Sequence, residues 1–290
     1  MTKQINADYS NLKTFVINLD DYIKNFNKQK PFLDKIGLPI ERFSGINALK
    51  DEHIEYNNII TKYAKNFSPK SVIGCSLSHI LCCKHIYNEF VTKNSKYDYY
   101  LMMEDDVFPL YDKNEFLKVL NINLFEITLL DKNWDIIQLH SDAFFPTYKT
   151  YITHYATGST AAYLISNKGI KKMIKEKVRS HLDFETQNFI RYNKYRVKKN
   201  LFYTNEKNSL NRFISNDKYT YYNMSLYLKS KLLQNFKNYI PLRGEKVYAN
   251  FLEFKLLRLP YINKEYTANE IIDYFLGAII LKKIIKRIKY

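Results

Sequence analysis

The sequence feature that most constrains the fold is an apolar run at residues 99–103 that ends in three consecutive acids, Glu104, Asp105 and Asp106. A short apolar run of this kind is typical of a buried strand. Open α/β sheets bind their ligands at the carboxyl ends of such strands. Adjacent carboxylates repel one another unless a cation or a basic group compensates them. We therefore expect an α/β sheet with a cation site at this edge, although a solvated acidic loop would give the same pattern.

Strand-like and helix-like segments alternate around this run. Residues 14–19 and 40–43 are predicted strands, and residues 25–36 between them are predicted to be a helix, so the three form a βαβ unit. A helix is expected over residues 76–90, with Gly74 just before it and Ser76 as its N-cap. Further strands are predicted at 135–139 and 159–165, and a helix at 167–174.

The alternation weakens beyond residue 203, which divides the chain into a predicted domain at residues 1–205 and a basic extension at 206–290. Residues 271–290 have the pattern of an amphipathic helix with five bases near its end. Such a helix would lie on an anionic membrane, or would pack on the catalytic domain with its basic face in solvent. We therefore expect a helical, basic C-terminal region.

The net charge of +16 favours anionic partners such as nucleic acid, anionic lipid or phosphorylated glycans. The first residues lack the apolar core of a secretory signal, so a cytoplasmic location is expected. Three cysteines, an odd number, fit reduced thiols better than a disulfide framework. A zinc site near Cys75 would need further ligands, and although His79 and His85 are close in sequence, no second Cys/His cluster completes a set.

A collinear series of short motifs runs through the first two thirds of the chain. The series is V-I-N-L-D at 16–20, E-R-F-S-G-I at 41–46, G-C-S-L-S-H at 74–79, E-D-D-V at 104–107, D-I-I-Q-L at 135–139 and A-T-G-S-T-A-A-Y-L-I-S at 156–166, followed by L-D-F-E at 182–185. In order and spacing it resembles glycosyltransferase family 25, which includes lipooligosaccharide galactosyltransferases. The resemblance covers roughly residues 13–190, and a collinear series is far more specific than any single motif.

The resemblance implies a GT-A type fold, a Rossmann-like α/β domain with a mixed central sheet that binds a nucleotide sugar. It also implies an inverting transfer from a UDP-sugar, most often UDP-galactose, with a manganese-like cation. The acceptor would be a hydroxyl of a glycan or lipid-linked glycan, as in lipooligosaccharide or surface glycan synthesis. Such an enzyme would work on the cytoplasmic face of the membrane, where a basic helix would hold it peripherally.

Residue roles follow from the resemblance in the same way. Asp106, with Glu104, would hold the metal, and Glu104 or Asp105 would face the ribose. The nucleotide pocket and the surroundings of the donor sugar would be formed by Val16, Ile17, Asn18, Ser78, His79 and Gly158. An inverting transfer needs a base for the acceptor hydroxyl; Asp183 is the first candidate and Glu185 the second, although Asp183 could equally be a helix cap.

Two departures from the family pattern bear on this site. The family commonly has arginines directly after V-I-N-L-D, where this chain has Asp21, Tyr22 and Ile23, so phosphate contacts from that segment are in question. The last histidine is His181, so the distal third offers no late histidine as a metal ligand.

Alternative functions remain open at this stage. Some relatives of family 25 glycosylate hydroxylysine in collagen-like proteins, and such an enzyme would share the donor pocket. A basic protein that binds nucleic acid would use lysine, arginine and interleaved tyrosine. No nucleic-acid-binding motif is present, so no nucleic acid partner is expected. An inactive member of the fold would bind the donor without turnover.

Overall fold

The computed structural model describes residues 9–93, 95–140, 159–179, 181–182, 186, 192–197, 199–205, 255–259 and 264–267. The chain divides into two compact units, one of residues 1–187 with 191–214 and one of residues 188–190 with 215–290. In the second unit, β9 (Lys255–Leu259) and β10 (Lys264–Thr267) form an antiparallel pair that the sequence had not predicted. The amphipathic helix expected at 271–290 lies outside the described residues.

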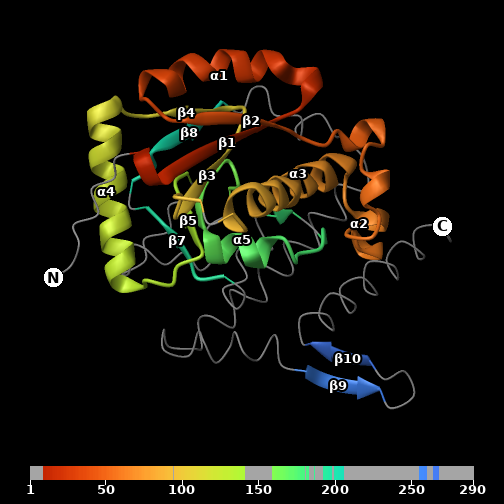
Figure 1. Cartoon of the computed structure of the whole chain (residues 1–290). Coiled ribbons are helices and arrows are strands. Elements are labelled where there is room, and N and C mark those ends of the chain that lie inside the picture. The colour runs from red at the N-terminus through yellow and green to blue at the C-terminus, as the bar shows by residue number, and fades with distance from the viewer. Residues whose placement is uncertain are drawn as a thin grey trace, which may run out of the picture. The chain divides into compact units, whose positions relative to one another are not determined.

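The first unit is built on a six-stranded mixed sheet in the order β2-β1-β3-β6-β5-β7 (Figure 1). Its strands are β1 (Leu12–Asn18), β2 (Ile40–Ser44), β3 (Tyr99–Glu104), β5 (Ile136–Gln138), β6 (Ala162–Ser166) and β7 (Lys194–Arg196). β1 pairs in parallel with β2 and with β3, whereas β6 runs antiparallel to both β3 and β5. The predicted α/β class with a mixed central sheet is confirmed.

Helices cover both faces of this sheet, and the side chains of β1 and β3 alternate between the two faces. The remaining helices and short strands are α1 (Ile23–Lys35), α2 (Lys62–Phe67), α3 (Lys70–Ile86), β4 (Val107–Pro109), α4 (Lys113–Leu130), α5 (Asn167–Met173) and β8 (Phe202–Thr204). Val16 and Met103 join the core cluster that includes residues of α1 and α4. Phe15 and Met102 join the cluster that includes residues of α3 and α5. Burial on both sides explains why β3 is apolar throughout.

The predicted βαβ unit is confirmed as β1, α1 and β2, and the predicted strands at 99–103, 135–139 and 159–165 correspond to β3, β5 and β6. The start of α3 was predicted wrongly. The helix begins at Lys70 with Pro69 as its N-cap, so Gly74 and Ser76 lie inside it. A Cβ on Gly74 would come within 2.7 Å of the Ile46 carbonyl oxygen, so glycine here permits close packing and does not end a segment.

None of the helices in the described part of the chain combines the length and the apolar character that crossing a bilayer requires.

Close packing also governs the start of α5, and this generates a testable expectation. A Cβ on Gly169 would lie 2.5 Å from the backbone oxygen of Asp135, which leaves no room for a methyl group. We expect Gly169→Ala to lower the free energy of unfolding by about 1 to 3 kcal/mol, because the backbone must shift to admit the methyl. Denaturant unfolding followed by circular dichroism would measure this.

The matched control is Lys168→Ala, in the same turn of α5 but exposed, which should change the unfolding free energy by no more than about 0.5 kcal/mol. Equal stability of the Gly169→Ala variant and the wild type would contradict the packing account.

Candidate functional site

The site lies at one edge of the sheet, where the carboxyl ends of three parallel strands meet. Asn18 ends β1, Ser44 ends β2 and Glu104 ends β3. Because β6 is antiparallel to β3, residues just before β6 reach the same edge, and the Glu104 N–H donates to the Ala161 carbonyl at 2.9 Å. A cavity opens here, lined by Ile17, Asn18, Leu19, Tyr22, Asn25, Ile46, Asn47, Ala48, Leu49, Ser71, Gly74, Cys75, Ser78, His79, Glu104, Asp105 and Asp106.

The acidic segment forms a turn between β3 and β4 that is fixed from behind. The buried Gln29 of α1 donates its side-chain amide to the Glu104 carbonyl (2.8 Å) and to the Val107 carbonyl (2.5 Å). On the far side, the Asn205 N–H donates to the Asp106 carbonyl at 2.8 Å, directly after β8, which pairs with β4. These bonds hold the backbone of the turn, so the positions from which the three carboxylate side chains project are fixed.

Asp105 is held by the end of β1. The Asn18 amide donates to Asp105 Oδ2 at 2.5 Å and to the Tyr22 carbonyl at 2.9 Å, while its Oδ1 accepts from Arg42 Nε at 2.8 Å. Burial raises the pKa of Asp105 and the negative charge of Glu104 adds to the rise, although the bond from Asn18 opposes it. Asn18 therefore couples the first motif, at 16–20, to the acidic motif at 104–107.

Glu104 has hydrogen-bonding neighbours of its own. The Thr160 hydroxyl donates to Glu104 Oε1 at 2.8 Å, and His79 Nε2 lies 3.4 Å from the same oxygen. Burial would raise the pKa of Glu104, but the interactions with His79 and Thr160 and the proximity of His181 outweigh it, so the pKa of Glu104 is lowered. Glu104 is thus the carboxylate of the three that stays charged most readily.

Asp106 is in the opposite situation. Its Oδ1 is buried and has no hydrogen-bond partner among the described residues. Burial, followed by the charges of Glu104 and Asp105, raises the pKa of Asp106 to about 7. A buried carboxylate oxygen without a partner beside two further carboxylates is the arrangement that a bound divalent cation would satisfy.

Most of the predicted site residues that the structure describes are brought together around this cavity. Its lining includes Ile17, Asn18, Ser78, His79, Glu104, Asp105 and Asp106. Val16 is placed elsewhere: its side chain is fully buried in the core. Gly158, Asp183 and Glu185 lie outside the described residues.

Ser78 and His79 have positioning contacts in this structure. The Ser78 hydroxyl donates to the Gly74 carbonyl at 2.7 Å and accepts from the Ile46 N–H at 2.8 Å, which joins α3 to the loop after β2. His79 Nδ1 lies 3.0 Å from the Tyr163 hydroxyl. Both residues thereby fix the wall of the cavity.

The segment after β1, where arginines were expected, obtains a basic group from the neighbouring strand. Arg42 of β2 forms an ion pair with Asp20. The bonds from Arg42 and Ser44 lower the pKa of Asp20. Arg42 donates to Asn18 and is not among the residues that line the cavity. Its charge therefore holds Asn18 and Asp20 in place at the end of β1.

Several residues of the site were not predicted from the sequence. Gln29 and Asn47 act through contacts with residues distant in the chain, and no short motif marks them. Thr160 lies in the motif at 156–166, but its bond to Glu104 was not predicted. Tyr22 lines the cavity and is 38% exposed. A tyrosine two residues after the V-I-N-L-D motif was the available signal for it.

Comparison with known proteins decides the family. The family model described as "Glycosyltransferase family 25 (LPS biosynthesis protein)" matches residues 11–186, more than half of the chain. The chain belongs to glycosyltransferase family 25. The matched range contains every described residue that lines the cavity, and the resemblance inferred from the motif series is confirmed.

Solved structures similar to this family 25 chain include A197 from STIV, with 9% identity over 66% of this chain and 82% of that chain and a TM-score of 0.33. A glycosyltransferase involved in the glycosylation of the major capsid of PBCV-1 has 10% identity over 56% and 62%, with a TM-score of 0.30. A Drosophila beta-1,4-galactosyltransferase 7 mutant in complex with manganese, UDP-Gal and xylobiose has 13% identity over 72% and 78%, with a TM-score of 0.36. No curated protein matches the sequence. The family assignment rests on the family model.

The raised pKa of Asp106 generates an expectation about stability. The pKa of Asp106 is about 7 in the folded protein and 3.8 in its reference state, so between these values the folded state binds more protons than the unfolded state. This group therefore stabilises the protein less as pH rises from about 4 to about 7. We expect Asp106→Asn, in chelator and without added metal, to be more stable than the wild type by about 1 to 3 kcal/mol at pH 8, with the difference shrinking steadily as pH falls and nearly gone at pH 4.

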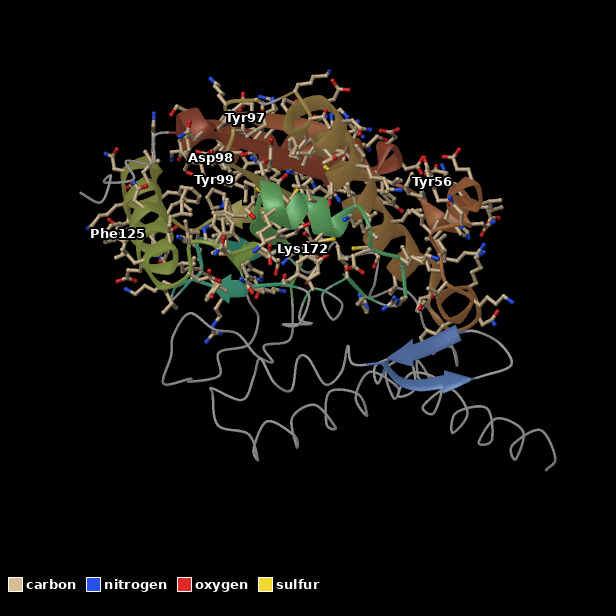
Figure 2. The ribbon with its side chains drawn as sticks, turned by 60° about the horizontal axis from the view of Figure 1, so that its bottom comes forward. Tyr56, Tyr97, Asp98, Tyr99, Phe125 and Lys172 are labelled. Atoms are coloured by element: carbon tan, nitrogen blue, oxygen red, sulfur yellow. The ribbon has the colours of Figure 1, made fainter. Side chains whose placement is uncertain are left out.

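Thermal unfolding from pH 4 to pH 8 would measure this difference. Asp98→Asn is the matched control, because Asp98 is exposed and directly precedes Tyr99 at the opposite end of β3 (Figure 2). Parallel pH profiles of the Asp106→Asn variant and the wild type would contradict the assignment of a raised pKa.

Proposed function

We propose that this family 25 chain is an inverting, metal-dependent enzyme that transfers a sugar, galactose from UDP-galactose, to a hydroxyl of a glycan acceptor. The observation that carries the proposal is the convergence of Glu104, Asp105 and Asp106 on the cavity at the carboxyl end of β3. Open α/β sheets bind ligands at this position. Residues 1–205 would form the catalytic domain.

The carboxylate ligands available here fit a hard divalent cation such as Mn²⁺. Carboxylate oxygens are the ligands that such ions prefer, and Asp106 supplies a buried oxygen that lacks a hydrogen-bond partner in the described structure. Asp106 and Glu104 would hold the ion. A cation bound there would offset the negative charge that develops on the diphosphate leaving group.

The neighbouring residues suit a nucleotide. Ile17, Leu19 and the partly exposed ring of Tyr22 give the cavity an apolar wall, on which a uracil base could stack. Asn18 presents a polar group, oriented by Arg42, next to Asp105. This combination of an apolar wall and an acidic end supports a UDP-sugar as the donor class.

Asp183 remains the proposed base, with Glu185 as the alternative. The residue before Asp183 is attached to the helix that forms the cavity wall: the Leu182 N–H donates to Ser76 Oγ of α3 at 3.1 Å. Cys75 and Ser78 of the same helix line the cavity. A carboxylate that follows this attachment would be available to accept the proton of the acceptor hydroxyl.

The location and acceptor also belong to the proposal. The net charge of +16 supports peripheral attachment to the cytoplasmic face of an anionic membrane, where a lipid-linked glycan would be presented. Lipooligosaccharide or another surface glycan is the acceptor class that the family description supports.

Release of UDP from a panel of UDP-sugars, with and without Mn²⁺, tests the reaction. We expect Mn²⁺-dependent release, fastest with UDP-galactose, and a loss of roughly 100-fold or more in kcat/KM for Asp106→Ala, because the charge on the leaving group would no longer be offset. Asp98→Ala, at the other end of β3, is the control and should keep wild-type rates. No release from any UDP-sugar, or metal-independent release, would refute the proposed reaction.

Tyr22 tests the nucleotide pocket independently of turnover. We expect Tyr22→Ala to weaken UDP binding roughly tenfold, because the stacking surface is lost, while Tyr22→Phe should bind nearly as well as the wild type. Calorimetry with UDP and Mn²⁺ would measure both. Unchanged affinity for UDP in the alanine variant would mean that the uracil base does not stack on Tyr22.

A further inference from the structure

A second group of potential metal ligands lies in the wall of the cavity. Cys75 and His79 stand one turn apart on α3, and Glu104 faces them from the end of β3. One ligand atom from each residue, the sulfur, a ring nitrogen and a carboxylate oxygen, lies within 4.8 Å of the other two. The sequence showed Cys75, His79 and His85 close together but offered no second Cys/His cluster to complete a set. Glu104 is brought to α3 only by the fold.

The orientation of His79 is suited to metal binding. Its Nδ1 lies 3.0 Å from the Tyr163 hydroxyl, and the two rings are stacked with their centroids 5.7 Å apart. This fixes the ring so that Nε2 faces Glu104 Oε1 at 3.4 Å. His79 is 1% exposed, and apart from this long approach to Glu104 its Nε2 has no hydrogen-bond partner within the described part of the chain. Metal-bound histidines are usually oriented by a contact of this kind at the other ring nitrogen.

The chemistry of the three ligands selects the class of ion. Thiolate and imidazole favour zinc-like ions, whereas Mn²⁺ and Mg²⁺ prefer sites made of oxygen atoms. Zinc bonds of about 2.0 to 2.3 Å place tetrahedral ligand atoms roughly 3.5 Å apart, so the group would need to contract by about an ångström. Cys75 and Glu104 are only partly buried, which leaves their side chains room to move. All three residues line the cavity, which leaves an open side for a fourth ligand.

We propose that Cys75, His79 and Glu104 form a binding site for a thiophilic divalent cation of the zinc class, beside the carboxylates of Asp105 and Asp106. The site shares Glu104 with the proposed Mn²⁺ position, so an ion held by Cys75 and His79 would draw Glu104 away from Asp106. Binding at this site does not depend on the proposed transferase activity, and it can be measured in the absence of any nucleotide.

Co²⁺ is the first probe, because a cobalt–thiolate bond gives a near-ultraviolet charge-transfer band that oxygen-only sites lack. We expect the purified full-length chain to bind one Co²⁺ with this band, and one equivalent of Zn²⁺ to remove it. Cys75→Ser should abolish the band. His79→Gln should weaken Zn²⁺ binding at least about tenfold, and Tyr163→Phe about tenfold through the loss of ring orientation.

Controls separate this site from its neighbours. Cys83→Ala removes a buried thiol about two helical turns beyond Cys75 on α3 and should leave the band intact. Asp106→Asn should also retain the band, since Asp106 is not a ligand of this site. Alkylation of the wild type, followed by mass spectrometry, gives a measurement without substitutions: Zn²⁺ should slow the modification of Cys75.

The absence of a thiolate band, a band that persists in Cys75→Ser, or alkylation of Cys75 at the same rate with and without Zn²⁺ would each overturn the proposal. Failure of Mn²⁺-dependent UDP release would refute the transferase proposal alone, because the cobalt band reports binding at Cys75 whatever the enzyme's activity.

Discussion

The interaction on which the site depends is the fixing of an acidic turn at the end of a fully buried strand. β3 is the central strand that parallel β1 and antiparallel β6 enclose, so its carboxyl end has a defined position relative to both. Gln29 bonds the backbone on either side of the turn, and Asn18 and Thr160 bond two of its carboxylates. Three acids that would repel one another are thus held together by the fold. The cost of ionisation is greatest at Asp106, whose pKa burial and the two neighbouring charges raise to about 7.

This arrangement gives each of the three acids a different environment. Glu104 is kept charged by its polar neighbours, Asp105 is engaged by Asn18, and Asp106 is left with a buried oxygen that lacks a partner in the described structure. The family 25 motifs at 16–20, 74–79 and 104–107 are therefore parts of one site, because the sheet brings their ends to a single edge. On the proposal that Cys75 and His79 bind a zinc-class ion, two kinds of cation would compete for Glu104.

Much of this could be predicted from the sequence. A continuous apolar run predicted β3, the order of motifs predicted the family, the strand-end rule placed the acids at a ligand-binding edge, and the family resemblance assigned Asn18 to the same site. Contacts between residues distant in the chain could not be predicted: nothing local indicates that Gln29 of α1 would reach the backbone beside Glu104, or that Glu104 would face Cys75 and His79. Gly74 was taken as the break before a helix because glycine often ends segments, whereas here it lets α3 approach the loop after β2. α4, with apolar residues on both its buried and exposed sides, was not identified as a helix at all.

The central claim is that the carboxyl end of β3 holds a divalent cation together with the nucleotide of the donor. Crystals grown with MnCl₂ and UDP, with diffraction measured at the manganese absorption edge, test it most directly. We expect one anomalous peak between Asp106 and Glu104, with the diphosphate bound to it and the base against Tyr22. A peak at another position, or UDP bound outside this cavity, would contradict the account.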